Sequence, residues 1–183
     1  MNVGENCVSG KDGVKRPVDV IIFATGFDVL AGLGDLKLSG TEGTVFTNFS
    51  KDKNNLPGAY LGSYFYGLPN MFFTLGPNSG LGHSSVVCII EVQLSHIIGL
   101  MRSAEQRGSK SVMVKKQTVD EYNVQLQRDM NGTVWESGGC SSWYRLYGTG
   151  KNTALWPWTI AWFWFKSSIL AIFKATNNFD FDV

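Results

Sequence analysis

Residues 19–27 read DVIIFATGF, and this stretch decides the expected fold class. It overlaps the largely apolar run Val18–Ala24, whose β-branched and aromatic side chains predict a buried strand. Thr25 and Gly26 end the run, and a glycine at this point lets the backbone turn sharply. Ligands of open α/β sheets bind beyond the carboxyl ends of the strands. The stretch therefore favours an α/β fold with a ligand crevice near the turn.

A second glycine turn leads into a predicted helix. Ala59–Gly67 and Asn70–Leu75 have the composition of strands, and Gly76-Pro77-Asn78 follows directly. After Ser85 the apolar side chains recur at spacings of three and four, which predicts an amphipathic helix of about six turns. These side chains belong to Val86, Ile89, Ile90, Leu94, Ile97, Ile98 and Met101. We expect Ser84 or Ser85 to cap the first amides of this helix.

The next segment predicts a short strand and another helix. Gly108 is expected to end the first helix, because glycine adopts the left-handed conformation found just after helices. Val112–Val114 then predicts a short strand. Thr118 and Glu121 have the spacing of a capping box, which predicts the start of a helix that runs through Met130.

The tail Ala154–Phe173 reads ALWPWTIAWFWFKSSILAIF and is apolar enough to suggest a membrane segment. Pro157 and Lys166 interrupt it, whereas a spanning helix needs about 20 predominantly apolar residues. Its tryptophans also suit a membrane interface, so peripheral membrane contact stays open as the less favoured interpretation. We expect a buried strand that packs within the domain.

The composition indicates one packed domain. The chain has 183 residues, of which 44% are hydrophobic and 17% charged, enough for a sizeable core. Its net charge of +1 leaves no strongly basic surface, which argues against nucleic-acid binding. The three cysteines are widely separated and fit no disulfide framework, and no secretory signal pattern follows Met1. We therefore expect a cytoplasmic protein.

Common catalytic motifs are missing from the sequence. No G-x-G-x-x-G turn follows a strand, so the usual cradle for a dinucleotide pyrophosphate is not present. The two histidines, His83 and His96, have no Cys, Asp or Glu at a metal-ligand spacing. Gly80–Ser84 lacks the G-x-S-x-G pattern of serine hydrolases. We expect no metal site, and no catalytic side chain can be assigned.

Two of the segments resemble flavin-containing and Baeyer-Villiger monooxygenases. Asp19–Phe27 resembles their D-x-[IV]-[IV]-x-A-T-G-[FY] strand, which returns from the NADP-binding domain to the FAD-binding domain. Leu68–Ser79 resembles the strand and turn that enter their last FAD-domain helix, whose N-terminus points toward the flavin ring. The resemblance implies that free amides of this helix stabilise negative charge on the flavin. The implied cofactor-binding residues are Thr25, Gly26, Gly76, Pro77, Asn78, Ser85 and Val86. A plain strand-to-helix connection is the structural alternative.

A third segment resembles the C-terminal S-W-Y and G-x-N region of Baeyer-Villiger enzymes. It comprises Ser142-Trp143-Tyr144 and, after a spacing that departs from the common form, Gly150-Lys151-Asn152. In those enzymes this region faces the nicotinamide cofactor and the substrate pocket, which makes Trp143 the implied cofactor-binding residue. A packed aromatic cluster is the alternative.

By resemblance, the fold is α/β and forms the C-terminal portion of a flavoprotein with two dinucleotide-binding domains. Residues 1–17 would end the NADP-domain region. Residues 18–108 would supply FAD-domain strands and the last helix of an incomplete Rossmann-type domain. Residues 109–183 would form a C-terminal α+β extension that faces cofactor and substrate.

The resemblance also implies a reaction. The parent enzyme would use FAD and NADPH to insert one oxygen atom from O2 into a small ketone, or to add it to a heteroatom. The two phosphate loops of the family and its F-x-G-x-x-x-H-x-x-x-W fingerprint are not in this sequence, so the chain alone is expected to be inactive. The alternative is a non-catalytic remnant or split subunit that packs against a partner, such as the missing N-terminal half.

Overall fold

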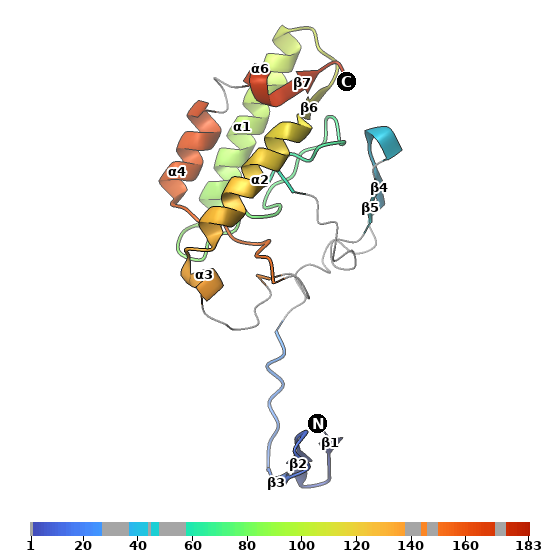
Figure 1. The fold of residues 1–183 in the computed structure, drawn as a ribbon, viewed down its shortest axis with the longest axis vertical. Coiled ribbons are helices and arrows are strands. Elements are labelled where there is room, and N and C mark those ends of the chain that lie inside the picture. The colour runs from blue at the N-terminus through green and yellow to red at the C-terminus, as the bar shows by residue number, and fades with distance from the viewer. Residues whose placement is uncertain are drawn as a thin grey trace.

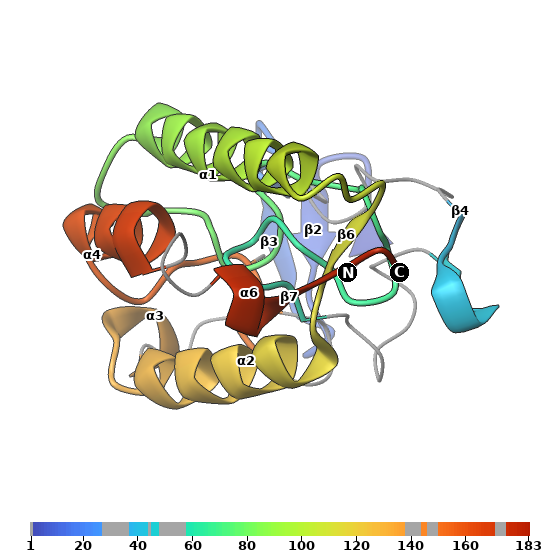
Figure 2. The ribbon, with the colours of Figure 1, turned by 90° about the horizontal axis from the view of Figure 1, so that it is seen from above.

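The computed structural model of the chain describes residues 2–26, 37–43, 45–47, 58–137, 144–145, 150–170 and 175–183. Its helices are α1 (Val86–Gln106), α2 (Lys116–Met130), α3 (Val134–Ser137), α4 (Ile160–Phe165) and α6 (Ala175–Asn178). A π-helical turn, Lys166–Leu170, continues α4. The two long helices lie on opposite sides of the core (Figures 1 and 2). α1 and α2 confirm the two long helices that the sequence predicts.

The strands are short and pair in three small antiparallel sheets. They are β1 (Asn2–Val3), β2 (Cys7–Ser9), β3 (Lys15–Pro17), β4 (Lys37–Ser39), β5 (Val45–Thr47), β6 (Val112–Val114) and β7 (Phe179–Phe181). The sheet β1-β2-β3 lies apart from the body, and an extended segment joins the two (Figure 1). β6 confirms the predicted strand, and it pairs with β7 so that Val112 lies opposite Phe181.

Three segments that the sequence predicts to be strands do not form strands in the structure. The segment Val18–Ala24 is extended but pairs with no described strand, and Val20 and Ile22 are 75% and 85% exposed. Ala59–Gly67 forms turns with an isolated bridge between Tyr60 and Tyr64, and Asn70–Leu75 is irregular. A strand needs a ladder of hydrogen bonds to a neighbour, whereas the described runs make only single backbone bonds, such as that from the Phe73 amide to the Ser63 carbonyl at 3.0 Å.

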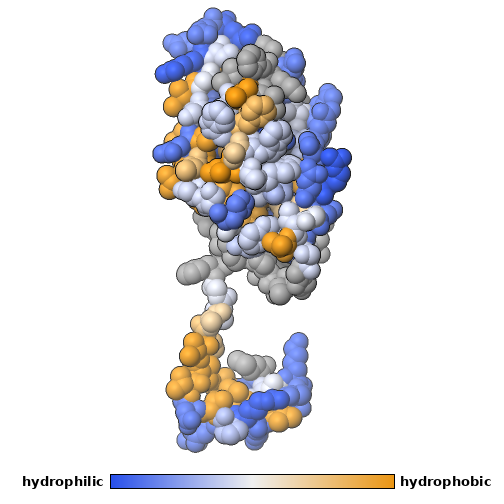
Figure 3. Space-filling model, turned by 90° about the vertical axis from the view of Figure 1, so that its left-hand side faces the viewer, coloured by the Kyte–Doolittle hydropathy of each residue, from blue (hydrophilic) through white to orange (hydrophobic). Residues whose placement is uncertain are grey.

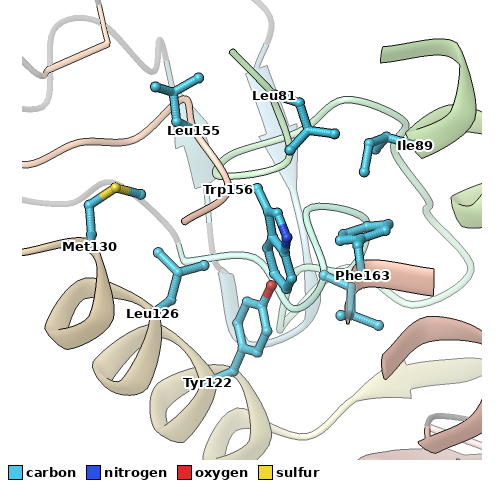
Figure 4. Close-up of a cluster of buried hydrophobic side chains, with 9 residues drawn as sticks. Leu81, Ile89, Tyr122, Leu126, Met130, Leu155, Trp156 and Phe163 are labelled. Atoms are coloured by element: carbon cyan, nitrogen blue, oxygen red, sulfur yellow. The ribbon is translucent and has the colours of Figure 1, made fainter. Parts of the chain in front are cut away.

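The main core lies between the inner faces of α1 and α2. Leu126 and Met130 of α2 are fully buried, and they share one cluster with Ile89 of α1 and with Trp156 (Figure 4). The remaining members are Leu61, Leu81, Tyr122, Leu155 and Phe163. Because the cluster draws on residues from 61 to 163, one core unites the two parts on either side of residue 108.

A second cluster surrounds a buried polar pair. Its apolar members are Tyr64, Ile97, Leu100, Val112, Val114, Val119 and Phe179. Within it the Tyr64 hydroxyl lies 2.6 Å from Nδ1 of His96, which is 5% exposed. Burial lowers the pKa of His96 from its ordinary 6.5 to about 4, so the imidazole is neutral in the folded protein. His96 is thus a core residue.

The helix ends only partly follow the sequence expectations. α1 stops where predicted, because Gly108 has a φ of 68° and its amide donates to the carbonyl of Glu105. The predicted caps are wrong. Ser85 precedes α1 but makes no side-chain capping hydrogen bond, and α2 starts after Lys115, ahead of the Thr118 capping box.

Residues 160–170 of the tail are helical, so the prediction of a strand is wrong there, while the predicted packing is confirmed. Thr159 caps α4 by accepting a hydrogen bond from the Trp162 amide at 3.2 Å. Trp156 and Phe163 are buried, whereas Trp164 is 51% exposed. Among the described helices, only α1 has the length and apolar composition to cross a membrane, a property that it shares with core helices of soluble proteins.

Candidate functional site

The structure brings two of the three motif segments together. The turn before α1 pairs through its backbone with residues 153–156, more than seventy positions along the chain. The Asn78 amide donates to the Thr153 carbonyl at 2.8 Å, and the Gly80 amide donates to the Ala154 carbonyl at 2.9 Å. The Trp156 amide donates back to the Gly80 carbonyl at 2.7 Å. The C-terminal segment therefore fixes the approach to α1.

The Asn78 side chain strengthens this connection. It is 4% exposed, and its Nδ2 donates to the carbonyls of Asn152 and Leu155, both at 3.0 Å. Gln127 of α2 also donates to the Asn152 carbonyl, at 3.0 Å. Asn78 has a positive φ of 55°, which asparagine tolerates better than most residues. Its amide is thus used inside the protein, where it positions the turn.

Gly76 is required by a close approach of two backbones. Its amide donates to the Gly62 carbonyl at 3.1 Å, and a Cβ at Gly76 would lie 2.3 Å from that oxygen. The Ser79 hydroxyl donates to the Gly76 carbonyl at 2.7 Å. The approach to the Gly62 carbonyl cannot relax without moving backbone, so a side chain at position 76 would displace the turn.

Gln93 holds the same turn from α1, and sequence reasoning missed it. Its Oε1 accepts from the Leu75 amide at 3.0 Å, and its Nε2 donates to the Leu61 carbonyl at 3.0 Å. Gln93 is 2% exposed, and both leucines have positive φ values, 53° for Leu61 and 54° for Leu75. The available signal was a polar residue on the apolar face of the predicted helix, since such residues are buried only with partners.

The N-terminus of α1 is open to a ligand. Ser84, Ser85 and Val86 are exposed, and no side chain caps the first turn. No acidic residue lies in that turn either. The first amides of a helix have no partner within it, and the helix dipole is positive there. This end of α1 can therefore donate hydrogen bonds to an anionic or carbonyl acceptor.

An aromatic hollow lies beside this helix end. It measures about 720 Å³ and is lined by His83, Gln125, Pro157, Trp158, Thr159 and Trp162. The Lys166 ammonium lies 4.7 Å from the ring centre of Trp158, at a distance typical of cation–π contact.

Two buried polar atoms next to the turn have no partner within the described part of the chain. They are Nδ2 of Asn152 and Oγ1 of Thr153. Asn152 is fully buried, and its Oδ1 accepts from the amides of Ala154 and Leu155. Buried polar atoms without partners are uncommon in folded proteins.

Thr25, Gly26 and Trp143 are the remaining predicted cofactor residues. Thr25 and Gly26 end the exposed extended segment that Figure 1 shows below the body. Gly26 does turn, with a φ of 74°. Trp143 lies outside the described residues. No group of His, Cys, Asp and Glu side chains that could hold a metal occurs in the described ranges.

Comparisons with known proteins show which proteins this chain is similar to. No protein-family model matches the chain. It is 38% identical over 156 residues to a Baeyer-Villiger monooxygenase of Pseudomonas aeruginosa, and 35% identical over 153 residues to one of Streptomyces coelicolor. These matches span 85% and 83% of the chain, but only 29% of each relative. An Aspergillus niger relative named FAD-binding monooxygenase is 29% identical over 153 residues, which are 81% of the chain and 24% of that relative.

A solved structure shows the same fold. Cyclohexanone monooxygenase from Rhodococcus, bound to NADP+, matches 96% of the chain with a TM-score of 0.73 and 23% identity. The match spans 32% of that protein. The chain is thus homologous over most of its length to Baeyer-Villiger monooxygenases and corresponds to about 29% of their length.

Proposed function

We propose that this chain forms the C-terminal portion of an FAD- and NADPH-dependent monooxygenase and presents the N-terminus of α1 to the flavin. One observation carries the proposal. The uncapped first turn of α1 is held in place by an internal network that joins residues 61–80, Gln93 and residues 152–156. The network also holds Leu61, Leu75 and Asn78 at positive φ values, and backbone strain of this kind clusters at functional sites.

The residues around this end fit a flavin edge. The exposed amides of Val86 and its neighbours are donors without a competing side-chain cap. They suit the electron-rich pyrimidine edge of FAD, where preorganised donors stabilise negative charge. Gly76, Pro77 and Asn78 position the helix end, while Ser85 and Val86 would contact the cofactor. When bound, FAD and NADPH supply the redox chemistry that transfers one oxygen atom to a ketone or a heteroatom.

We also propose a division of the chain into three parts. Residues 1–17 end the NADP-domain region, residues 18–108 belong to the FAD-binding domain, and residues 109–183 form the extension on the cofactor and substrate side. Thr25, Gly26 and Trp143 remain cofactor-facing candidates. We place the assembled enzyme in the cytoplasm.

The test is reconstitution. The chain is co-expressed with the part of the Pseudomonas relative that lies outside its match to this chain. The purified complex should be yellow and should consume NADPH and O2 in equal molar amounts when cyclohexanone or a thioether is added. A complex that forms but takes up no flavin would contradict the proposed function.

A non-catalytic remnant is the second candidate. It is favoured by the apolar side chains that α1 and residues 20–23 leave exposed, because such surfaces drive association without requiring catalysis. This candidate predicts a stable complex without flavin-dependent oxygen consumption.

A further inference from the structure

The buried pair of Tyr64 and His96 has no part in the proposed contact with the flavin. The Tyr64 hydroxyl lies 2.6 Å from Nδ1 of His96, and the two residues are only 2% and 5% exposed. Phe179 of β7 packs against both rings, with its ring centre 5.0 Å from that of Tyr64 and 6.2 Å from that of His96. The pair is therefore separate from the apolar surface that Figure 3 shows along the connection between the N-terminal sheet and the body. It places a phenol against an imidazole in a dry site.

His96 is placed to accept a proton from Tyr64. Burial lowers the pKa of His96 to about 4 and raises the pKa of Tyr64 well above its ordinary value, so both side chains are neutral near neutral pH. A neutral imidazole has one nitrogen without hydrogen, and the hydrogen bond from the Tyr64 hydroxyl assigns this role to Nδ1. A general base must lie about 2.6–3.2 Å from the atom whose proton it takes, which this contact satisfies. A phenol that has lost an electron is positively charged and far more acidic, so even an imidazole of lowered pKa then takes its proton.

A string of phenol and indole rings joins this pair to the aromatic hollow beside α1. The ring centre of Tyr64 lies 6.3 Å from that of Tyr60, which lies 5.2 Å from that of Tyr122. Tyr122 shares the main core with Trp156, and Figure 4 shows its hydroxyl end beside the Trp156 ring. The ring centre of Trp156 lies 4.5 Å from that of Trp158, which lines the hollow. Ring centres about 4.5–7 Å apart are typical of direct aromatic contact, so an electron has a continuous path from Tyr64 to the hollow.

We propose that Tyr64 and His96 form a site of one-electron oxidation, which removes oxidising equivalents from the cofactor side of the protein. A one-electron oxidant derived from O2 takes an electron from Trp158, and Tyr64 replaces that electron through the string. The O–H bond of Tyr64 breaks as its proton moves to Nδ1 of His96, which leaves a neutral tyrosyl radical and a protonated imidazole. One electron from ascorbate, with return of the proton from His96, restores the pair. The inference rests on the proposed function only for the source of the oxidant.

Simple core packing is the alternative interpretation, and it does not require this pair. The neighbouring side chains Ile97, Leu100 and Phe179 are apolar. Replacing both partners of a buried hydrogen bond by apolar groups of the same shape is often nearly neutral for stability. A buried neutral histidine, in contrast, lowers the stability of the folded protein in acid. A polar pair with this cost and no advantage in packing favours a chemical role.

The test uses the intact chain without flavin, so it does not depend on cofactor binding. Flash photolysis of tris(bipyridine)ruthenium with persulfate supplies the one-electron oxidant, and transient absorption and electron paramagnetic resonance detect the tyrosyl radical. We expect a long-lived tyrosyl radical in the wild type and its loss in Tyr64→Phe. The matched control is Tyr144→Phe, which removes a phenol outside the string and should leave the radical unchanged.

His96→Gln separates the role of a base from that of a hydrogen-bond partner. The glutamine carbonyl accepts a hydrogen bond from Tyr64 but does not take its proton. A positioned base contributes roughly 10²–10⁴-fold to proton transfer, so formation of the radical should slow by about 100-fold in this variant. A tyrosyl signal that survives Tyr64→Phe, or formation at the wild-type rate in His96→Gln, would overturn the inference. Circular dichroism shows whether each variant is folded. The expected radical in a protein that takes up no flavin on reconstitution would support this pair while contradicting the proposed function.

Discussion

Replacing Gln93 should loosen the turn that positions α1. Gln93→Met keeps nearly the same volume but removes the acceptor for the Leu75 amide and the donor for the Leu61 carbonyl. An unpaired buried polar group costs roughly 1–3 kcal/mol, so the two together predict about 3 kcal/mol of lost stability. Both leucines also have positive φ values that the glutamine stabilises, so the loop should relax when these bonds are lost.

The assay is urea unfolding followed by tryptophan fluorescence. Trp156 is buried in the main core, and Trp135 and Trp158 pack against that core, so the tryptophan emission of the chain reports its loss. The matched control is Ser95→Ala, because Ser95 is an exposed residue of the same helix whose hydroxyl donates only to the Glu91 carbonyl. The control should change stability by less than about 0.5 kcal/mol. A Gln93→Met protein as stable as this control would refute the positioning role.

Three further perturbations test the network and the core. Gly76→Ala places a Cβ 2.3 Å from the Gly62 carbonyl oxygen and should lower the free energy of unfolding in urea by about 2 kcal/mol or more. The control is Gly99→Ala in α1, whose Cβ would have no atom within 4 Å, and it should stabilise the chain by up to about 1 kcal/mol. Asn78→Asp replaces a donor to two carbonyls with an acceptor and should destabilise the chain by about 2 kcal/mol or more, and an unchanged midpoint would contradict the assigned contacts. The pKa of His96 is about 4 in the folded protein, against an ordinary value of 6.5. The folding stability that depends on a neutral His96 is therefore fully present above pH 6.5, and about 2–3 kcal/mol of it is lost as pH falls toward 4. Unfolding measured from pH 7.5 to 4.5 should show this loss, and it should shrink in His96→Phe.

The sequence predicted the helices well because each is specified locally. Gly108 marks the end of α1, and Ile89 and Ile97 of its predicted apolar face are buried. The other side of that predicted face is exposed, at Val86, Leu94, Ile98 and Met101. The predicted strands failed for the opposite reason. A strand such as Val18–Ala24 is completed by hydrogen bonds from another segment, and within the described residues only the Val18 amide makes such a bond, to the Asn6 carbonyl.

The candidate site was partly predictable. The motif residues from Gly76 to Val86 do converge on the α1 N-terminus, and Asn152 does lie beside Asn78. The position of Gln93 on the apolar face of the predicted helix signals a buried polar residue, but its partners, the backbone groups of Leu61 and Leu75, do not follow from a side-chain pattern. The missing cap at Ser85 was equally invisible, since capping depends on the rotamer and not on residue type alone.

The central claim is that the first amides of α1 bind the flavin, and one pair of variants tests it directly. Val86→Pro removes a single amide donor at the first helical position, where proline is tolerated, and Ser85 already has the extended conformation that must precede proline, with φ −71° and ψ 120°. Val86→Ala removes the side chain but keeps the amide. In the reconstituted complex, FAD titration should show about tenfold weaker binding for Val86→Pro and near wild-type binding for Val86→Ala. Equal FAD affinity in the two variants would contradict the claim.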